Sequence, residues 1–346
     1  IYRNIRPTCS TIGTVFVSNS ACSVKGKGIV LKEPSVVAID TASKKVLAVG
    51  EEARRMVGRT PNNIVAIRPL RDGVISDYET TEKMIKYFLT RVIKSSVFKP
   101  RVIICVPSGV TEVEEMAVEE AAKNAGAKYV GLIEEPKAAA IGAGIDILRP
   151  NGNIVVDVGG GTTDIAVLSL GEVVLSDSIK VAGDKFDESI VKYIRREYNM
   201  LIGERTAENI KQEIGCVYEQ PEVSTMIIKG RCLLNGLPKS IEINSNEIMQ
   251  PLQECAFSIV DALHGVLERT PPELVGDIYQ NGVVMTGGGA LIRGFDQLIS
   301  SRIGIKTRVA DDAVSCVAIG TGKSLDYIDK HDNAETSVFT RSNRRY

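Results

Sequence analysis

The strongest constraint on the fold is an apolar run that stops at an aspartate and is followed by consecutive glycines. In residues 153–171, NIVVDVGGGTTDIAVLSLG, the first apolar segment ends at Asp157, and Gly159, Gly160 and Gly161 precede a second apolar run. Apolar runs on both sides of a short polar stretch predict a strand, a tight turn and a second strand. Consecutive glycines let backbone N–H groups converge on an anion, because no Cβ atom stands in the way. The turn is therefore a candidate phosphate site, although glycine motifs are weak evidence and a hairpin without a ligand is the alternative.

The polar residues of this turn suit a phosphate and a metal ion. Thr162 and Thr163 carry hydroxyl groups that can donate to phosphate oxygens. Asp157 would repel phosphate directly, but a carboxylate at this place can hold a divalent cation through water.

A second glycine cluster follows another apolar run. In residues 283–295, VVMTGGGALIRGF, three glycines come directly after the predicted strand, and a helix is expected to begin near Ala290. Such a turn would place backbone N–H groups at a helix N-terminus. Neither cluster matches the GxxxxGK[ST] or GxGxxG spacing. Two glycine turns of this kind, one in a hairpin and one opening a helix, resemble the nucleotide clasp of the actin, Hsp70 and sugar-kinase fold.

Strands alternate with helices in two similar halves of the chain. The 346 residues are enough for two domains. Residues 80–95 show a helical stripe, 101–107 read as a buried strand, and a polar β-rich insertion spans 217–248. Thr111 and Glu114 have the spacing of a capping box at the start of a helix. We therefore predict two α/β domains that face each other across a cleft, joined at residues 147–153.

Composition and charge exclude several classes of protein. The net charge is −1, Trp is absent and aromatic residues make up 5%, so nucleic acid is not expected as a partner. The seven cysteines have neither metal nor disulfide spacing, which indicates buried thiols in a reducing compartment. No apolar stretch approaches the roughly 18 residues of a membrane span, and no signal peptide is recognised. These features predict a cytoplasmic protein that can still touch a membrane surface.

Long segments of the chain resemble the MreB and MreB-like (Mbl) family of bacterial actins. The similarity runs from about residue 24 to about residue 330. It is carried by KGKGIVLKEPSVVAID, VPSGVTEVE, LIEEPKAAAIGAG, DVGGGTTDIAVLSLG, AGDKFDESI, YNMLIGERTAENIK, ERTPPELVGDI and TGGGALIRGFDQLI.

The resemblance implies an α/β, actin-like ATPase fold, with two duplicated ribonuclease-H-like domains around a nucleotide cleft, each carrying a small subdomain. The boundaries expected from it are as follows: domain I, residues 1–150, with a small subdomain at about 38–70 and a returning segment at about 316–330; domain II, residues 151–315, with a small subdomain at about 183–245; and a disordered tail, residues 331–346.

The function implied is that of a cytoskeletal protein that controls cell shape. Such a protein would bind ATP or ADP with Mg²⁺ and polymerise into paired, membrane-associated filaments. Its partners would be copies of itself, paralogous MreB-type subunits, the inner face of the cell membrane, and membrane proteins of cell shape or elongation. A small-molecule kinase or a chaperone-type ATPase of the same fold is the alternative. The kinase would need a catalytic base and a substrate pocket, and the chaperone would need a further peptide-binding domain.

The resemblance also assigns roles to individual residues. Glu135, which directly precedes a proline in EEP, would position the hydrolytic water, whereas the alternative is that Glu134 and Glu135 form a solvated pair. Lys211 matches a position over the adenine. The catalytic set is Glu135 and Thr162, Asp157 is the metal ligand through water, and the nucleotide-binding set is Asn19, Asp157, Gly159, Gly160, Gly161, Thr162, Thr163, Gly183, Glu204, Glu208, Lys211, Gly287, Gly288, Gly289 and Ala290.

The first phosphate loop of the family is degenerate in this chain. Where the family reads IGIDLGTANTLVYV, residues 11–24 read TIGTVFVSNSACSV. Thr14 replaces the aspartate, Phe16 the glycine and Val17 the threonine, and only Asn19 is kept. One outcome is weak nucleotide binding or slow hydrolysis, with assembly alongside intact paralogues; the other is that the remaining loops suffice for binding and a reduced activity. Because ordered Mg²⁺ and water contribute several kcal/mol to phosphoryl transfer, we expect retained binding with weakened hydrolysis.

One loop is a candidate membrane contact. In KSSVFKP, residues 94–100, Val97 and Phe98 lie between lysines, and family members insert an apolar loop at this place into the bilayer. The alternative is that Phe98 packs under its own loop.

Overall fold

The computed structural model forms two compact units. The first comprises the described residues up to Arg149 and those from Ser315 onwards, and the second is Pro150–Val314. The chain therefore passes between the units twice, at 149/150 and at 314/315. The residues that the structure describes are 11–15, 19–61, 63–71, 74–75, 77–92, 99–108 and 110–330.

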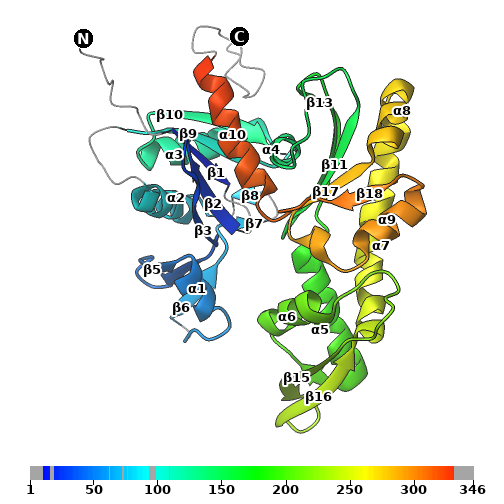
Figure 1. The fold of residues 1–346 in the computed structure, drawn as a ribbon. Helices are drawn as coiled ribbons and strands as arrows, with labels where there is room; N and C mark the ends of the chain where they lie inside the picture. Colours follow the sequence, from blue (N-terminus) through cyan, green and yellow to red (C-terminus); the bar gives the residue numbers. More distant parts are fainter. Residues whose placement is uncertain are drawn as a thin grey trace. The chain divides into compact units, whose positions relative to one another are not determined.

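The main sheet of the first unit has five strands in the order β10-β9-β1-β2-β3. β1, β2 and β3 are antiparallel neighbours, whereas β1, β9 and β10 are parallel. One face of the sheet packs against α2 and α3, and α10 lies on β1 and β2 (Figure 1). The bounds are β1 Thr11–Val15, β2 Asn19–Val24, β3 Gly28–Pro34, α2 Tyr78–Val92, β9 Arg101–Val106, α3 Glu112–Asn124, β10 Tyr129–Glu134, α4 Glu135–Gly142 and α10 Cys316–Lys330.

The helices α4 and α10 touch through their backbones. A Cβ atom at Gly142 would lie 1.8 Å from the carbonyl oxygen of Cys316, and one at Gly320 would lie 1.7 Å from the carbonyl oxygen of Ala138. α10 also approaches the sheet closely, since a Cβ at Gly13 would lie 3.0 Å from the carbonyl oxygen of Thr321. Glycine at these positions is what lets α10 complete the first unit.

A small sheet belongs to the same unit. Its order is β5-β4-β6, with α1 packed on it around the buried Ala38 and Ala53. β4 and β5 pair antiparallel and form a hairpin. The bounds are β4 Val37–Asp40, β5 Val46–Val49, α1 Glu51–Met56 and β6 Ile64–Ile67; a two-stranded ribbon, β7 Leu70–Arg71 and β8 Val74–Ile75, follows.

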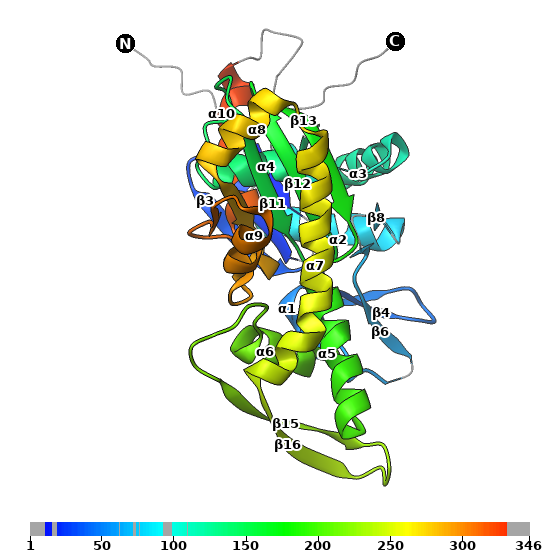
Figure 2. The same cartoon turned by 90° about the vertical axis from the view of Figure 1, so that its right-hand side faces the viewer.

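The second unit repeats the topology of the first. Its sheet order is β13-β12-β11-β17-β18, in which three antiparallel strands are again followed by two parallel ones. The helix α7 runs along β12 and β13 (Figure 2). A second small sheet has the order β14-β15-β16; β15 and β16 lie in the predicted β-rich insertion, whereas β14 precedes it in the sequence. The bounds are β11 Asn153–Val158, β12 Thr163–Ser169, β13 Glu172–Ile179, α5 Gly183–Tyr198, β14 Met200–Leu201, α6 Glu204–Ile214, β15 Thr225–Cys232, β16 Pro238–Asn244, α7 Ser245–Arg269, α8 Pro272–Asn281, β17 Val283–Thr286, α9 Phe295–Ile303 and β18 Thr307–Val309.

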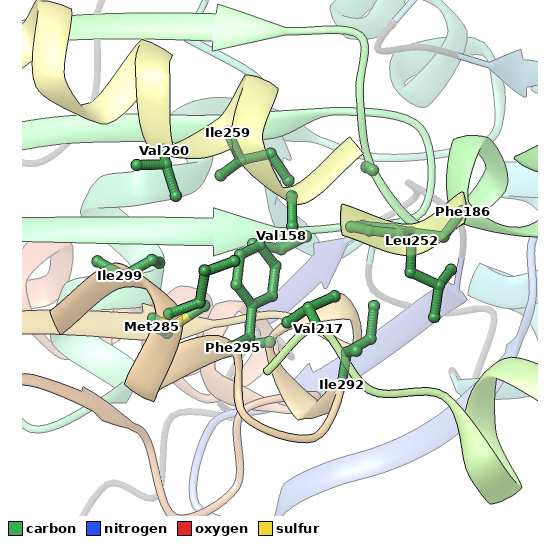
Figure 3. Close-up of a cluster of buried hydrophobic side chains, with 14 of the residues drawn as sticks. Val158, Phe186, Val217, Leu252, Ile259, Val260, Met285, Ile292, Phe295 and Ile299 are labelled. Atoms are coloured by element: carbon green, nitrogen blue, oxygen red, sulfur yellow. The ribbon is translucent and has the colours of Figure 1, made fainter. Parts of the chain in front are cut away.

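The hydrophobic core of the second unit includes Val158, the last residue of β11. Figure 3 shows Val158 of β11 beside Phe295 of α9 and Met285 of β17, with Ile259 of α7 nearby. Phe186 of α5 and Phe295 meet edge to face with ring centroids 6.2 Å apart. Buried aromatic pairs of this kind hold α5 and α9 at fixed places on the sheet.

Several local predictions are confirmed. Thr111 and Glu114 form the capping box of α3. The stripe in α2 is buried at Met84, Ile85, Phe88 and Leu89. Of the cysteines that the structure describes, all are free, and all except Cys255 are buried.

The prediction of a helix beginning near Ala290 is wrong. Residues Gly289–Leu291 form a single 3₁₀ turn, and α9 begins at Phe295, after Gly294 with φ +77°. Between these two elements Ile292 is extended, and Arg293 forms a β-bridge with Cys216, in which the Val217 N–H donates to the Arg293 carbonyl at 3.0 Å.

No helix within the described ranges is both long and apolar enough to cross a bilayer.

Candidate functional site

The glycine turn after β11 is closed by its own backbone and fixed to α5. Val158 and Thr163 are paired across the hairpin, and the Gly159 N–H donates to the Thr162 carbonyl at 3.0 Å. At the start of α5, the Gly183 N–H donates to the Gly159 carbonyl at 3.1 Å, and the Asp184 N–H donates to the Gly160 carbonyl at 2.7 Å. The predicted strand–turn–strand is confirmed, and the position of its turn depends on the first residues of α5.

The two threonines of the turn are used differently. Thr163 is fully buried, and its hydroxyl donates to the Val181 carbonyl at 2.6 Å. The Thr163 hydroxyl hydrogen is therefore used within the fold and is not available to a ligand. Thr162 is also buried, and it occupies the last position of the turn itself.

Asp157 is a buried carboxylate at the end of β11. It is 5% exposed and accepts a hydrogen bond from the Thr286 hydroxyl at 2.8 Å. Burial raises the pKa of Asp157, the Thr286 hydrogen bond opposes that shift, and the buried Asp164 on the paired strand adds to it. Within the described ranges no cation forms an ion pair with Asp157. This donor set fits a hydrated divalent cation, which would supply the missing positive charge.

The second glycine cluster lies against the end of β11. A Cβ at Gly287, where φ is +82°, would lie 2.2 Å from the Val158 carbonyl oxygen, and one at Gly289 would lie 2.4 Å from Val158 Cγ1. At Gly288 a Cβ would meet nothing within 4 Å. Packing inside the chain therefore explains two of the glycines, but it does not explain Gly288. The adjoining Ala290 is buried.

This contrast gives a prediction for the two neighbouring glycines. Gly287→Ala is expected to lower the free energy of unfolding by about 2 kcal/mol or more, because the new methyl group overlaps β11 in a backbone conformation that favours glycine. Gly288→Ala should leave thermal stability unchanged, and it should weaken nucleotide binding if the ligand lies against this backbone. Thermal unfolding and nucleotide titration of both variants check the prediction. Equal losses of stability in the two variants would contradict it.

Lys211 of α6 connects that helix to the first turn of α5. Its Nζ donates to the Gly183 carbonyl at 2.8 Å and to Asp187 Oδ2 at 2.9 Å. Glu204 is exposed in the first turn of α6, and Glu208, half-buried one turn later, accepts a hydrogen bond from Gln212 at 3.3 Å. The glycine turn, Gly183 and Lys211 thus form one bonded group, and the 287–289 cluster adjoins it through Val158.

Glu135 belongs to the first unit and is the first residue of α4, directly after β10. It is 4% exposed, so the alternative of a solvated pair of glutamates at a strand end is wrong for this residue. The side chain of Asn19 lies outside the described residues, as do Phe16, Val17, Val97, Phe98 and the tail from 331 to 346.

Three residues of this region were not identified from the sequence. They are Asp164, Asp187 and Thr286. Thr286 had a usable signal, since it stands directly before the glycines in MTGGG, and the parallel pairing of β11 with β17 brings it opposite Asp157.

A family model described as "MreB/Mbl protein" matches residues 12–333. The chain belongs to the MreB/Mbl family. It is 57% identical over 314 residues to the cell shape-determining protein Mbl of Bacillus subtilis (strain 168), covering 90% of this chain and 94% of that protein. It is 52% identical over 320 residues to the cell shape-determining protein MreB of Escherichia coli (strain K12), covering 91% and 92% of the two chains.

Solved structures agree with this assignment. The crystal structure of MreB5 of Spiroplasma citri bound to AMPPNP has a TM-score of 0.91 and 42% identity, covering 94% of this chain and 98% of that one. A MamK double helical filament has a TM-score of 0.78 at 19% identity, covering 92% and 98%, and it supports the fold alone. The predicted actin-like fold is confirmed, and the family gives the chain a cytoskeletal, actin-like role in cell shape.

Proposed function

We propose that this chain binds a nucleoside di- or triphosphate at the 159–162 turn and assembles with copies of itself into filaments that help to determine cell shape. The observation that carries the proposal is the turn itself, closed by its own hydrogen bond and tied to the first residues of α5. MreB5 of Spiroplasma citri, of the same fold, was crystallised with AMPPNP and with ADP, which supports nucleotide binding. The relatives are cell shape-determining proteins, which argues against the kinase and chaperone alternatives.

Different residues of this chain would bind the phosphates, the ribose and the metal ion. Backbone N–H groups of the glycine turn bind phosphate oxygens, and the 287–289 backbone receives the ribose and α-phosphate. Asp157, fixed by Thr286, would hold Mg²⁺ through water, and the ion would supply positive charge to the bound phosphates. Within the described ranges no cluster of three or more His, Cys, Asp or Glu side chains could bind a metal by itself, so the nucleotide would complete the coordination.

Hydrolysis is proposed to be slow. Glu135, as a carboxylate, can accept a proton from a water that attacks the γ-phosphorus. The first phosphate loop has Thr14, Phe16 and Val17 in place of the family's aspartate, glycine and threonine. The loss of that carboxylate removes one group that orders metal and water, so turnover below that of a family member with an intact loop is expected.

Glu135→Gln is expected to lower ATP turnover by about a hundredfold and to leave nucleotide affinity unchanged. An amide cannot take the proton of the attacking water, and general-base catalysis contributes on the order of 10²–10⁴-fold. Phosphate release measured under single-turnover conditions checks this. Glu134→Gln is the matched control, with unchanged turnover expected. Equal turnover in the wild type and in Glu135→Gln would remove Glu135 from the mechanism.

Assembly is tested by sedimentation with ATP, with ADP and without nucleotide, followed by electron microscopy of the pellet. Protofilaments that depend on nucleotide are the expected result, and a protein that binds nucleotide but stays in the supernatant under all conditions would refute the filament role. Contact with the inner face of the membrane through Val97 and Phe98, and binding to paralogous subunits and to shape or elongation proteins, remain predictions from the sequence.

A further inference from the structure

We infer that Asp187 is a positioning residue for the nucleotide site, which acts by holding Lys211 against the first turn of α5. The inference rests on the proposed function, because the site that it positions is the proposed phosphate turn. It concerns a residue that lies outside the glycine clusters.

Asp187 and Lys211 form a buried ion pair. Asp187 lies one turn into α5 and accepts from Lys211 Nζ at 2.9 Å; the two side chains are 14% and 12% exposed. By comparison, the pair of Arg269 and Asp177 is 52% and 40% exposed at the same distance. A buried pair is screened far less by solvent, so the Asp187 carboxylate holds the Lys211 ammonium group firmly in one place.

Lys211 is connected to the phosphate turn through Gly183. The same ammonium group donates to the Gly183 carbonyl at 2.8 Å. The N–H groups of Gly183 and Asp184 in turn hold the carbonyls of Gly159 and Gly160. Three hydrogen bonds in series thus connect Asp187 to the turn: Asp187 to Lys211, Lys211 to the Gly183 carbonyl, and the Gly183 N–H to the Gly159 carbonyl. Gly183 therefore contacts Lys211 through its carbonyl and the turn through its N–H.

The Asp187 carboxylate is in an unfavourable environment for its charge. Its Oδ1 is buried and has no hydrogen-bond partner among the described residues. Burial raises the pKa of Asp187 to about 6, more than Lys211 lowers it, and Glu208 of α6 and Asp184 of α5 add to the rise. The ionised carboxylate is therefore disfavoured in the folded unit, and a buried polar atom without a partner calls for an explanation. Holding Lys211 in place for the site provides that explanation.

The test compares Asp187→Asn with the wild type, first without nucleotide. An amide keeps the shape of the side chain but loses its charge, so Lys211 is no longer held by an ion pair. Hydrogen exchange at the amides of Gly183 and Asp184 is expected to be about tenfold faster in the variant. Lys211→Met breaks the same bond from the other side and should give the same acceleration. Glu188→Gln is the matched control, since Glu188 lies on the same helix in an exposed pair with Lys185, and no change is expected there.

Nucleotide titration then tests the consequence for the site. Asp187→Asn should weaken ADP binding about tenfold while the thermal stability of the nucleotide-free protein is kept or increased. The double variant Asp187→Asn/Lys211→Met should bind as Lys211→Met does, because both changes break one series of contacts. Additive losses, or unchanged exchange and affinity in Asp187→Asn, would overturn the inference. A wild type that binds no nucleotide would instead overturn the proposed function, whereas the exchange measurement would still test the contacts from Asp187 to Gly183.

A pH series separates positioning from a merely structural role. The charged groups that act on Asp187 are Lys211 and Glu208 of α6 and Asp184 of α5. Protonating Asp187 would release Lys211, so ADP affinity of the wild type should fall between about pH 7 and pH 5 more steeply than that of Asp187→Asn. Parallel pH profiles for the two proteins would count against the inference.

Discussion

Gly320→Ala is expected to lower the free energy of unfolding of the first unit by about 3 kcal/mol. The added methyl group would lie 1.7 Å from the Ala138 carbonyl oxygen and 2.9 Å from the Gly142 amide nitrogen. Both neighbours are backbone atoms of α4, which cannot rotate away as the end of a side chain can. The only relief is to move α10 off α4, and that movement opens the buried contact on which the three consecutive alanines of α4 depend.

Thermal unfolding followed by circular dichroism measures the effect, and limited proteolysis shows which unit opens first. Gly142→Ala should behave like Gly320→Ala, since it meets the Cys316 carbonyl from the other side. Gly265→Ala is the control: it also adds a methyl group to a helix, but into open space, and should stabilise by about 0.5–1 kcal/mol. Equal melting temperatures for Gly320→Ala and Gly265→Ala would show that the close helix contact does not matter.

Asp157→Asn is expected to abolish the stabilisation that Mg²⁺ and nucleotide give, and to raise the stability of the nucleotide-free protein. Asp157 is buried beside Asp164 with one neutral donor, Thr286, so its negative charge is unfavourable until a cation arrives. Removing that charge should add on the order of 2 kcal/mol to the nucleotide-free protein near pH 8. The loss of metal-dependent binding follows from the loss of the carboxylate.

The pH dependence has a definite sign. Because the pKa of Asp157 is raised in the folded state, its protonated form favours folding, and stability is lost as the pH rises through that raised pKa. The advantage of Asp157→Asn over the wild type should therefore be small near pH 4 and should grow towards pH 8. Asp177→Asn is the control, since Asp177 is an exposed partner of Arg269, and its change should stay within about 0.5 kcal/mol. A nucleotide-free Asp157→Asn protein that melts below the wild type at pH 8 would contradict this account.

The strands, the hairpin turn and the amphipathic helices were predictable because their signals are local. Alternation and apolar runs marked β9 and β11, and the capping pair of Thr111 and Glu114 marked the start of α3. The failures come from contacts between residues far apart in the sequence. The helix expected near Ala290 does not form there because Arg293 pairs with Cys216, which lies far earlier in the sequence.

In the candidate site, too, the residues with a local sequence signal were predictable, and those placed by distant contacts were not. Its glycines and Asp157 were found from the pattern of residues, because a strand followed by glycines is visible in a short window. Asp187 looks from sequence like one more charged residue of an amphipathic helix. Its burial depends on α6, which brings Lys211 across to it from 24 residues later. Glu135 is the first residue of α4, and Pro136 next to it occupies a position that proline favours.

The double crossing of the chain between its units has a consequence for synthesis on the ribosome. The second unit, Pro150–Val314, is continuous and can fold once its last residue has emerged. The first unit is begun earlier but is finished later, since α10 supplies contacts to β1, β2 and α4 only after residues 316–330 have been made. Until then the α4 surface that receives Cys316 and Gly320 stays uncovered. Nascent chains that expose residue 314 outside the ribosome, but not residues 316–330, should therefore carry a protease-resistant second unit and a protease-sensitive first one, the reverse of the usual order in which domains mature.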